Sequence, residues 1–316
     1  MTTHHPVELT APDISRYAKG TGGIPYVHSF DSGKPGPHVM VNALTHGNEI
    51  CGAIALDRIF TLGLKPKQGK MTFAFVNVAA YRRFDPAKPN ASRFVDEDFN
   101  RVWVESRLDG PEQSAELKRA RELRPVFDQA DFLLDIHSMG TRSTALMIVH
   151  GLDKERKLAK EVGVPPWIVA GQGHIEGKRL IEYTPFNDRS NAKTAILVEC
   201  GQHWEANAAK VALDTALRFL GVTGTIDHET MMKHVHEKTP KPQKMVDVSG
   251  GYTAKTSEFK FVKDFTGLEH FAKAGSPIAT DGGETVGTPH DDCYLIMPNH
   301  RAKKGDRALR FGRPSA

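Results

Sequence analysis

Apolar runs short enough to be buried strands alternate with helix-like stretches over the first two-thirds of the chain. Residues 38–44 and 71–78 are the first two such runs, and the helix-like stretch 49–62 separates them. Later strands are predicted at 131–136, 145–149, 167–170 and 194–198, and later helices at 112–129 and 205–220. The alternation predicts an α/β fold, with a mixed, largely parallel sheet and helices on both faces.

The texture of the sequence changes after residue 224. Residues 234–244 contain two prolines among charged side chains, which is typical of a linker. From residue 245 the apolar runs are short and interrupted by glycine and proline, which indicates a small β-rich C-terminal domain. We therefore predict an α/β domain at 1–233, a linker at 234–244 and a β-rich domain at 245–316.

Composition and charge exclude several classes of protein. The chain has 316 residues, of which 25% are charged and 39% hydrophobic, as in ordinary globular proteins. No apolar run approaches the ~18 residues that a membrane span needs, so we expect no membrane association. The net charge is only +4 and the basic residues are spread out, so we expect no nucleic-acid partner. The N-terminus lacks a signal-peptide pattern and three distant cysteines suit a reducing compartment, which predicts a cytoplasmic protein.

Polar residues follow the predicted strands, at the edge where α/β sheets bind their ligands. His46 and Glu49 follow the first strand, His137 follows the third and Glu199 follows the sixth. His46 and Glu49 are three residues apart at a helix start, which places them on one face. Two histidines and a carboxylate leave the fourth position of a zinc ion open for water, so His137 is the natural third ligand. Asp135, on the same strand face, is predicted to orient His137.

Each of these residues also has an ordinary structural interpretation when it is taken alone. A lone His-x-x-Glu is common, and a histidine at a strand end usually meets solvent. Glu199 could be a carboxylate that caps a helix. Their joint placement at strand ends is what favours a metal site.

Four motifs occur in a fixed order between residues 39 and 201: VNALTHGNE, DEDFNR, LLDIH and ILVECG. Together they resemble the succinylglutamate desuccinylase/aspartoacylase family, which has a zinc carboxypeptidase-like fold. The resemblance implies that the α/β domain is catalytic and holds one Zn²⁺ per chain through His46, Glu49 and His137. It also implies that Glu199 is the general base.

The resemblance further implies residues that bind substrate. Asn100 and Arg101 of the DEDFNR motif would hold a substrate carboxylate. Some members carry an arginine ten residues before the catalytic glutamate, and Arg189 has that spacing here. Its guanidinium suits bidentate carboxylate capture, although a surface ion pair is the other interpretation. The family's Asn-Pro-x-Ala segment is altered to NVAAYRRF, which leaves open whether Arg82 or Arg83 reaches the site.

These observations predict a zinc-dependent amidohydrolase that removes an acyl group from a small anionic N-acylated amino acid or related amide. Glu199 would take a proton from the zinc-bound water and return it to the leaving nitrogen. The C-terminal domain would narrow the pocket against long peptides. Two alternatives stay open, a metallocarboxypeptidase with an open cleft and a catalytically silent binding protein that keeps the metal. The acyl group, the amino acid and whether the chain forms a homo-oligomer also stay open.

Overall fold

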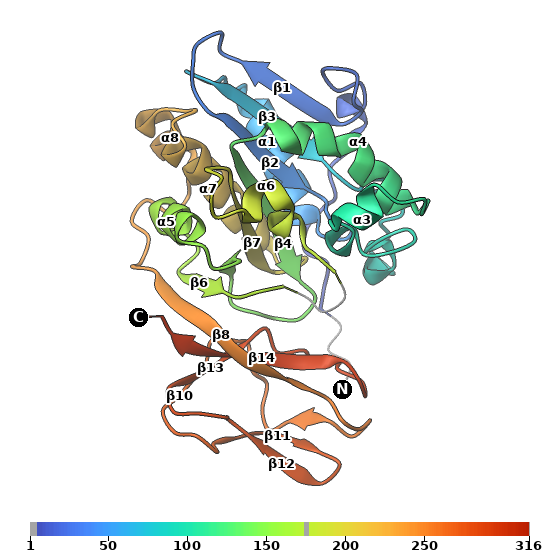
Figure 1. Ribbon diagram of the computed structural model, residues 1–316, viewed down its shortest axis with the longest axis vertical. Coiled ribbons are helices and arrows are strands. Elements are labelled where there is room, and N and C mark those ends of the chain that lie inside the picture. Colours follow the sequence, from blue (N-terminus) through green and yellow to red (C-terminus); the bar gives the residue numbers. More distant parts are fainter. Residues whose placement is uncertain (1–4, 174–176, 316) are drawn as a thin grey trace.

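A mixed sheet of eleven strands organises the computed structural model, which describes residues 5–173 and 177–315 (Figure 1). The strands of its α/β part are β1 (Val27–Asp31), β2 (His38–Ala43), β3 (Lys70–Phe75), β4 (Phe132–Met139), β5 (Leu146–Val149), β6 (Trp167–Ala170) and β7 (Thr194–Gln202). They lie in the order β1-β3-β2-β4-β7-β5-β6, and β1 and β5 run antiparallel to their neighbours β3 and β7. The predicted mixed, largely parallel sheet is confirmed.

Helices cover both faces of this sheet, as predicted. One layer consists of α1 (Ile50–Leu62), α5 (Asp153–Val162), α7 (Ala206–Val222) and α8 (His228–His234). The other consists mainly of α3 (Glu105–Leu108), α4 (Ala115–Gln129) and α6 (Thr184–Asn187). Strand residues alternate between the two cores, so that Val39 and Val41 face the α1 layer while Met40 faces the α4 layer. None of the helices in the described ranges is long and apolar enough to cross a membrane.

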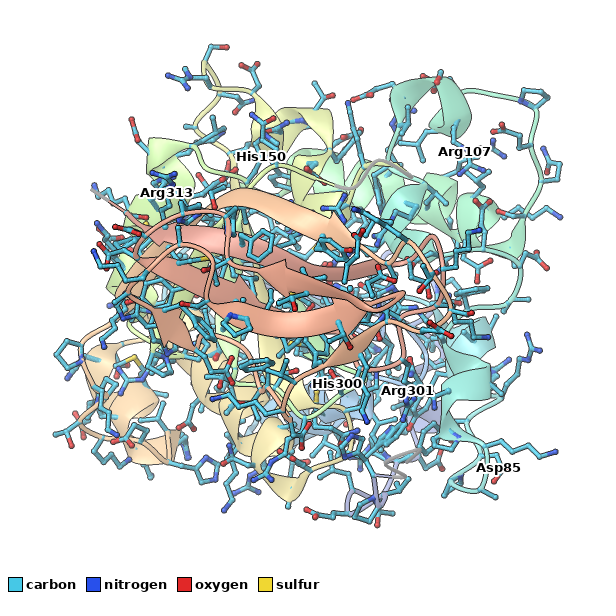
Figure 2. All side chains as sticks on the ribbon, turned by 90° about the horizontal axis from the view of Figure 1, so that it is seen from below. Asp85, Arg107, His150, His300, Arg301 and Arg313 are labelled. Atoms are coloured by element: carbon cyan, nitrogen blue, oxygen red, sulfur yellow. The ribbon has the colours of Figure 1, made fainter. Side chains whose placement is uncertain are left out.

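The β-rich C-terminal region that the sequence predicts is present, and it continues the main sheet. Its strands are β8 (Lys244–Thr253), β9 (Lys260–Phe261), β10 (His270–Phe271), β11 (Pro277–Asp281), β12 (Glu284–Gly287), β13 (Cys293–Ile296) and β14 (Arg307–Pro314). β8 pairs parallel to β6 and antiparallel to β14, while β9, β11 and β12 form a second sheet. Seen from below, these strands lie across the end of the α/β part (Figure 2).

Residues 235–243 contain no helix or strand and connect α8 to β8. The division into domains at 1–233 and 245–316 with a linker at 234–244 stays a prediction. The parallel pairing of β6 with β8 makes one continuous sheet out of strands from both predicted domains.

Two predicted strands are longer than the sequence suggested, and one is shorter. β4 and β7 continue through His137 and Glu199, because these two residues are partners in the parallel register between the strands. The sequence placed both residues after their strands, so this detail is corrected. The strand predicted at 71–78 ends at Phe75, and the short helix α2 (Val78–Tyr81) follows, capped by the side chain of Asn77.

Candidate active site

A cavity of about 390 Å³ lies at the carboxyl ends of β2, β4 and β7. Six of the seven residues that the sequence singled out as metal, catalytic or substrate-binding residues line it: His46, Glu49, Asn100, Arg101, His137 and Glu199. The structure therefore brings together side chains from positions 46 to 199 of the chain. Arg189 is the exception.

His46 and Glu49 are held by a turn rather than by a helix face. Glu49 is the N-cap of α1, and its backbone N–H donates to the carbonyl of His46 at 3.2 Å. The two side chains still meet, with 2.7 Å between His46 Nδ1 and Glu49 Oε1. A Cβ on Gly47 would lie 2.4 Å from the carbonyl oxygen of Ser92, so only glycine lets the neighbouring segment approach this turn so closely.

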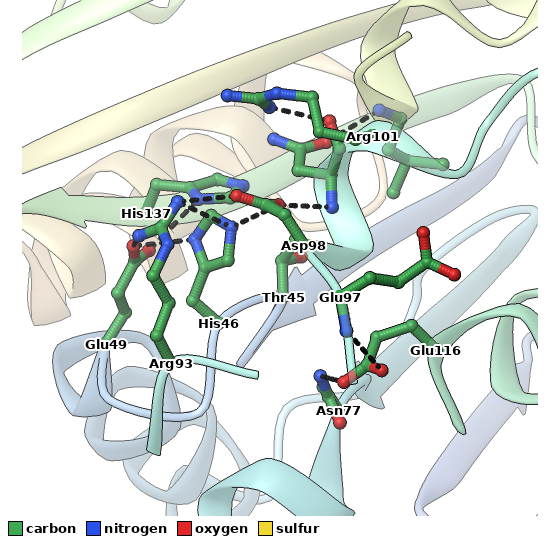
Figure 3. A network of polar contacts seen from close by, with 12 residues as sticks. Thr45, His46, Glu49, Asn77, Arg93, Glu97, Asp98, Arg101, Glu116 and His137 are labelled. Atoms are coloured by element: carbon green, nitrogen blue, oxygen red, sulfur yellow. Dashed lines mark hydrogen bonds and ion pairs between the residues drawn. The ribbon is translucent and has the colours of Figure 1, made fainter. Parts of the chain in front are cut away.

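Glu49 lies between the two histidines (Figure 3). His137 Nδ1 is 3.0 Å from Glu49 Oε2, so both Nδ1 atoms point to the same carboxylate. The other ring nitrogens are each held by a further carboxylate. His137 Nε2 is 2.8 Å from Asp135 Oδ2, and His46 Nε2 is 2.9 Å from Asp98 Oδ1. Asp135 thus has the geometry of the orienting group that the sequence suggested, and Asp98 has the same geometry toward His46.

The donor set fits a divalent cation. One ligand atom each of His46, Glu49 and His137 lies within 4.8 Å of the others, and all three residues are buried. With neutral imidazoles, the carboxylates of Glu49, Asp98 and Asp135 outweigh the guanidinium of Arg93 by two charges. A buried excess of negative charge is costly unless a cation compensates it.

Charge coupling within the cluster also favours added positive charge. Burial alone would raise the pKa of Glu49, but His46 and His137 together hold that pKa well below its usual range. Burial alone would lower the pKa of His137, but Asp135 and Glu49 hold it well above its usual range. The cluster thus favours anionic carboxylates and a cationic centre.

Glu199 faces this cluster from the neighbouring strand. It is partnered with His137 in the β4–β7 register, and only 8% of its surface is exposed. Its Oε2 atom is buried and has no hydrogen-bond partner among the described residues. Burial raises the pKa of Glu199 well above its usual range; the charge of His137 opposes this shift and that of Glu49 adds to it. A carboxyl group with a raised pKa, beside histidines but not bonded to them, is suited to moving protons near neutral pH.

Arg93 is a cavity residue that sequence reasoning missed. Its Nη2 lies 2.9 Å from Asp98 Oδ2 and 3.0 Å from His46 Nε2, and its Nη1 lies 3.4 Å from Glu49 Oε1. Arg82 donates instead to the hydroxyl of Tyr26, and Arg83 is exposed; neither lines the cavity. The sequence signal that could have identified Arg93 is its place in the chain, because it lies seven residues before Asn100 in the same long loop.

A family model identifies the family of this chain. A model of the succinylglutamate desuccinylase/aspartoacylase catalytic domain matches residues 35–221, more than half of the chain. The chain belongs to this family.

Solved structures share the fold over most of their length. A succinylglutamate desuccinylase/aspartoacylase of Rhodobacter sphaeroides superposes with a TM-score of 0.67 at 17% identity, covering 90% of this chain and 87% of that one. The product-bound ectoine utilization protein EutE (DoeB) of Ruegeria pomeroyi gives a TM-score of 0.65 at 16% identity, covering 92% and 88%. At these identities the likeness establishes the fold alone.

One curated relative is closer in sequence over a shorter segment. The N-acyl-aromatic-L-amino acid amidohydrolase (carboxylate-forming) of Rattus norvegicus is 34% identical over 127 residues. The match spans 37% of this chain and 38% of that relative's length.

Arg189 lies away from the cavity of this family member, which corrects the expectation from its spacing. It occupies an exposed turn before the first residue of β7, whereas the cavity is at the carboxyl end of that strand. The six residues from Thr194 to Glu199 run extended, and their five steps separate the two ends by roughly 16 Å. The ten-residue spacing thus carries Arg189 to the opposite edge of the sheet.

The DEDFNR motif presents its side chains from a short 3₁₀ turn, Phe99–Arg101. The side-chain oxygen of Asn100 accepts a hydrogen bond from the N–H of Leu180 at 2.8 Å, which leaves its amide nitrogen as the donor for a ligand. Arg101 Nη1 donates to the carbonyl of Asn100 at 2.7 Å. Both residues line the cavity, which is compatible with binding a carboxylate.

His203 is a second cavity residue that sequence reasoning missed. Its Nδ1 is 2.8 Å from the hydroxyl of Ser138, whose backbone N–H donates to Glu49 Oε2 at 3.1 Å. Burial lowers the pKa of His203 to about 3, so its ring is neutral near pH 7. Its sequence signal was weak, since it follows Glu199 by four residues with no recognisable spacing.

A buried carboxylate on α4 holds the loop that presents Arg93 and Asp98. Glu116 is fully buried and accepts hydrogen bonds from three successive backbone N–H groups, those of Val95, Asp96 and Glu97, at 2.7, 3.0 and 3.2 Å. The side-chain amide of Asn77 adds a fourth donor at 3.0 Å (Figure 3). A carboxylate can accept all four, whereas an amide turns one NH₂ group toward the donors.

Glu116→Gln is therefore expected to lower the free energy of unfolding by roughly 1.5–3 kcal/mol, the usual value for hydrogen bonds to a charged group. Urea denaturation measures this change. Glu122→Gln is the matched control, because Glu122 is an exposed residue of the same helix and its loss costs at most about 0.5 kcal/mol. Equal stability of the two variants would contradict an anchoring role for Glu116.

Proposed function

We propose that the chain is a zinc-dependent amidohydrolase that removes an acyl group from a small N-acylated amino acid or a related amide. The observation that carries the proposal is the arrangement of Glu199 beside the histidines. Its Oε2, which has no hydrogen-bond partner in the described part of the chain, shares one cavity with a buried His-Glu-His set of the kind that leaves a zinc position open. Family membership supports the same class of reaction, since the family is described by two deacylating activities.

His46, Glu49 and His137 would hold the zinc ion. A bound zinc ion lowers the pKa of a coordinated water and polarises a carbonyl group. Glu199 Oε2 would accept the proton of the attacking water and then donate it to the leaving nitrogen, as general base and then general acid. The guanidinium of Arg93, fixed by Asp98 and Glu49, would stabilise negative charge on the oxygen of the scissile carbonyl.

Asn100 and Arg101 would orient the substrate through a carboxylate, using the Asn100 amide nitrogen and the Arg101 guanidinium. The curated relative's name supports N-acyl amino acids as the substrate class. Size supports small substrates over peptides, because Val248, Ile296 and Arg310 of the C-terminal region line a cavity of about 390 Å³. A metallocarboxypeptidase would need a cleft that this region leaves free.

The substrate class is tested with N-acetyl-, N-succinyl- and N-formyl-amino acids, measured beside unblocked peptides on zinc-loaded protein. Hydrolysis of the N-acylated compounds alone is the expected result. Turnover of peptides with none of the N-acylated compounds would replace the proposal with a carboxypeptidase, and zinc binding without any turnover would favour a silent binding protein.

His137→Ala is expected to lose zinc and activity together, because it removes one of the two nitrogen ligands of the proposed site. Metal analysis of the purified protein should fall from one zinc per chain to near zero. His270→Ala, a change at an exposed histidine on β10, should retain the metal. If His137→Ala kept one zinc with wild-type affinity, His137 would not be a ligand.

Glu199→Gln keeps the size and polarity of the side chain but cannot accept the proton. We expect turnover to fall by ~10²–10⁴, the usual contribution of a positioned acid–base group, while zinc content is retained. A structural carboxylate would instead show altered stability with activity largely intact. Steady-state kcat, zinc content and melting temperature measured on this variant decide between the two, and a near-normal kcat with zinc bound would require another base.

A further inference from the structure

Arg310 brings a cation into the cavity from the C-terminal region. It lies on β14, opposite Ile296 of β13, and both residues line the cavity. Its Nη1 and Nη2 donate to two backbone carbonyls, those of Gln172 and Gly173, at 3.1 and 3.2 Å. Within the described ranges, no carboxylate lies within ion-pair distance of this guanidinium. Its hydrogen bonds among the described residues are thus to neutral acceptors.

Two other arginines of the cavity have acidic partners. Arg179 Nε is 2.9 Å from Glu182 Oε2, and Arg93 contacts Asp98 and Glu49. Arg310 instead lies near further arginines, with no ion pair to a carboxylate of the described residues. Burial lowers the pKa of Arg310 first, the charges of Arg179 and Arg307 lower it further, and the charge of Glu182 opposes this shift. A partly buried guanidinium beside like charges is unfavourable unless an anion joins it.

An apolar strip lies on the cavity wall around this cation. Ile148 of β5, Val169 of β6, Leu197 of β7 and Val248 of β8 come from successive strands of the same sheet and all line the cavity. Such a strip contacts hydrocarbon well and hydrates poorly. A ligand that satisfies both features is amphipathic, with an apolar segment against the strip and an anionic group at Arg310.

We propose that Arg310 is a specificity-determining residue that binds a second anionic group of the substrate, in addition to the carboxylate held at Asn100 and Arg101. This inference rests on the proposed amidohydrolase function. The second group belongs either to the acyl chain or to the amino-acid side chain, and both carry the same carboxylate chemistry. The C-terminal region thus contributes to substrate selection directly, through a charged side chain.

Two pairs of compounds test the inference, each with an anionic and a neutral member of similar size. N-acetyl-L-glutamate and N-acetyl-L-glutamine differ on the side chain, and N-succinyl-L-leucine and N-butyryl-L-leucine differ on the acyl chain. Kinetics are measured on the wild type, Arg310→Gln and Arg313→Gln, all zinc-loaded. Arg313 is the matched control, since it is exposed on the same strand and does not line the cavity.

The wild type should prefer the anionic member of at least one pair. Arg310→Gln should then lower kcat/KM for that member by about ten- to a hundredfold, chiefly through KM, because it removes a charge-assisted hydrogen bond. The neutral member should change by less than about twofold, and Arg313→Gln should resemble the wild type. A wild type without preference, or an Arg310→Gln variant that affects both members equally or neither, overturns the inference.

Calorimetric binding of the same compounds to Glu199→Gln protein, with and without Arg310→Gln, gives a readout that needs no turnover. Weaker binding of the anionic member alone in the double variant supports the role of Arg310. Glu199-dependent hydrolysis with no effect of Arg310→Gln overturns this inference and leaves the proposed function standing. If no compound is bound or hydrolysed, both fail.

Discussion

The Glu49 carboxylate is the point at which the separate parts of the site meet. It contacts His46 from its own turn, His137 from β4 and Arg93 from the long loop. Because all of this is buried, each group changes the charge state of the next, and the cluster is stable only when positive charge balances its carboxylates. Asp98 and Asp135 add negative charge while they fix the rings. The same residues therefore orient the histidines and create the demand for a cation.

The sheet supplies the accuracy that this cluster needs. β2, β4 and β7 are parallel neighbours, so the residues at their carboxyl ends lie at one edge. The register that pairs His137 with Glu199 puts both side chains on the cavity face, while Val198 and Cys200 face the α1 layer. A slip of one residue would turn Glu199 toward the helices. The apolar packing of β7 on both faces thus determines where the carboxylate lies.

The His-Glu-His cluster could be predicted from the sequence because strand ends are local features. His46, Glu49, His137 and Asp135 follow or end short apolar runs, and parallel topology then brings them together. Arg189 does not line the cavity, because the residues between it and Glu199 include an extended strand and do not fold back toward the site.

The rest of the site depends on contacts that no local pattern records. Arg93 reaches the cluster because Glu116, on a later helix, accepts three backbone N–H groups of the loop that follows it. Its neighbour in sequence, Phe94, is partly exposed, so hydrophobic patterning gives no signal there. The β-rich region could be recognised from its texture, but the pairing of β8 with β6 that carries it to the cavity is long-range.

The α/β part and the C-terminal strands contribute different side chains to the cavity. His46, Glu49, His137 and Glu199 come from the α/β part, whereas Val248, Ile296 and Arg310 come from β8, β13 and β14. Because β6 and β8 share one parallel ladder, the C-terminal strands are positioned by backbone hydrogen bonds that do not involve the cavity side chains. Substitutions on the cavity face of β8, β13 or β14 can therefore alter which ligands fit the cavity while the backbone frame stays in place. The positions of Glu49, in the turn between β2 and α1, and of Glu199, on β7, are independent of such changes.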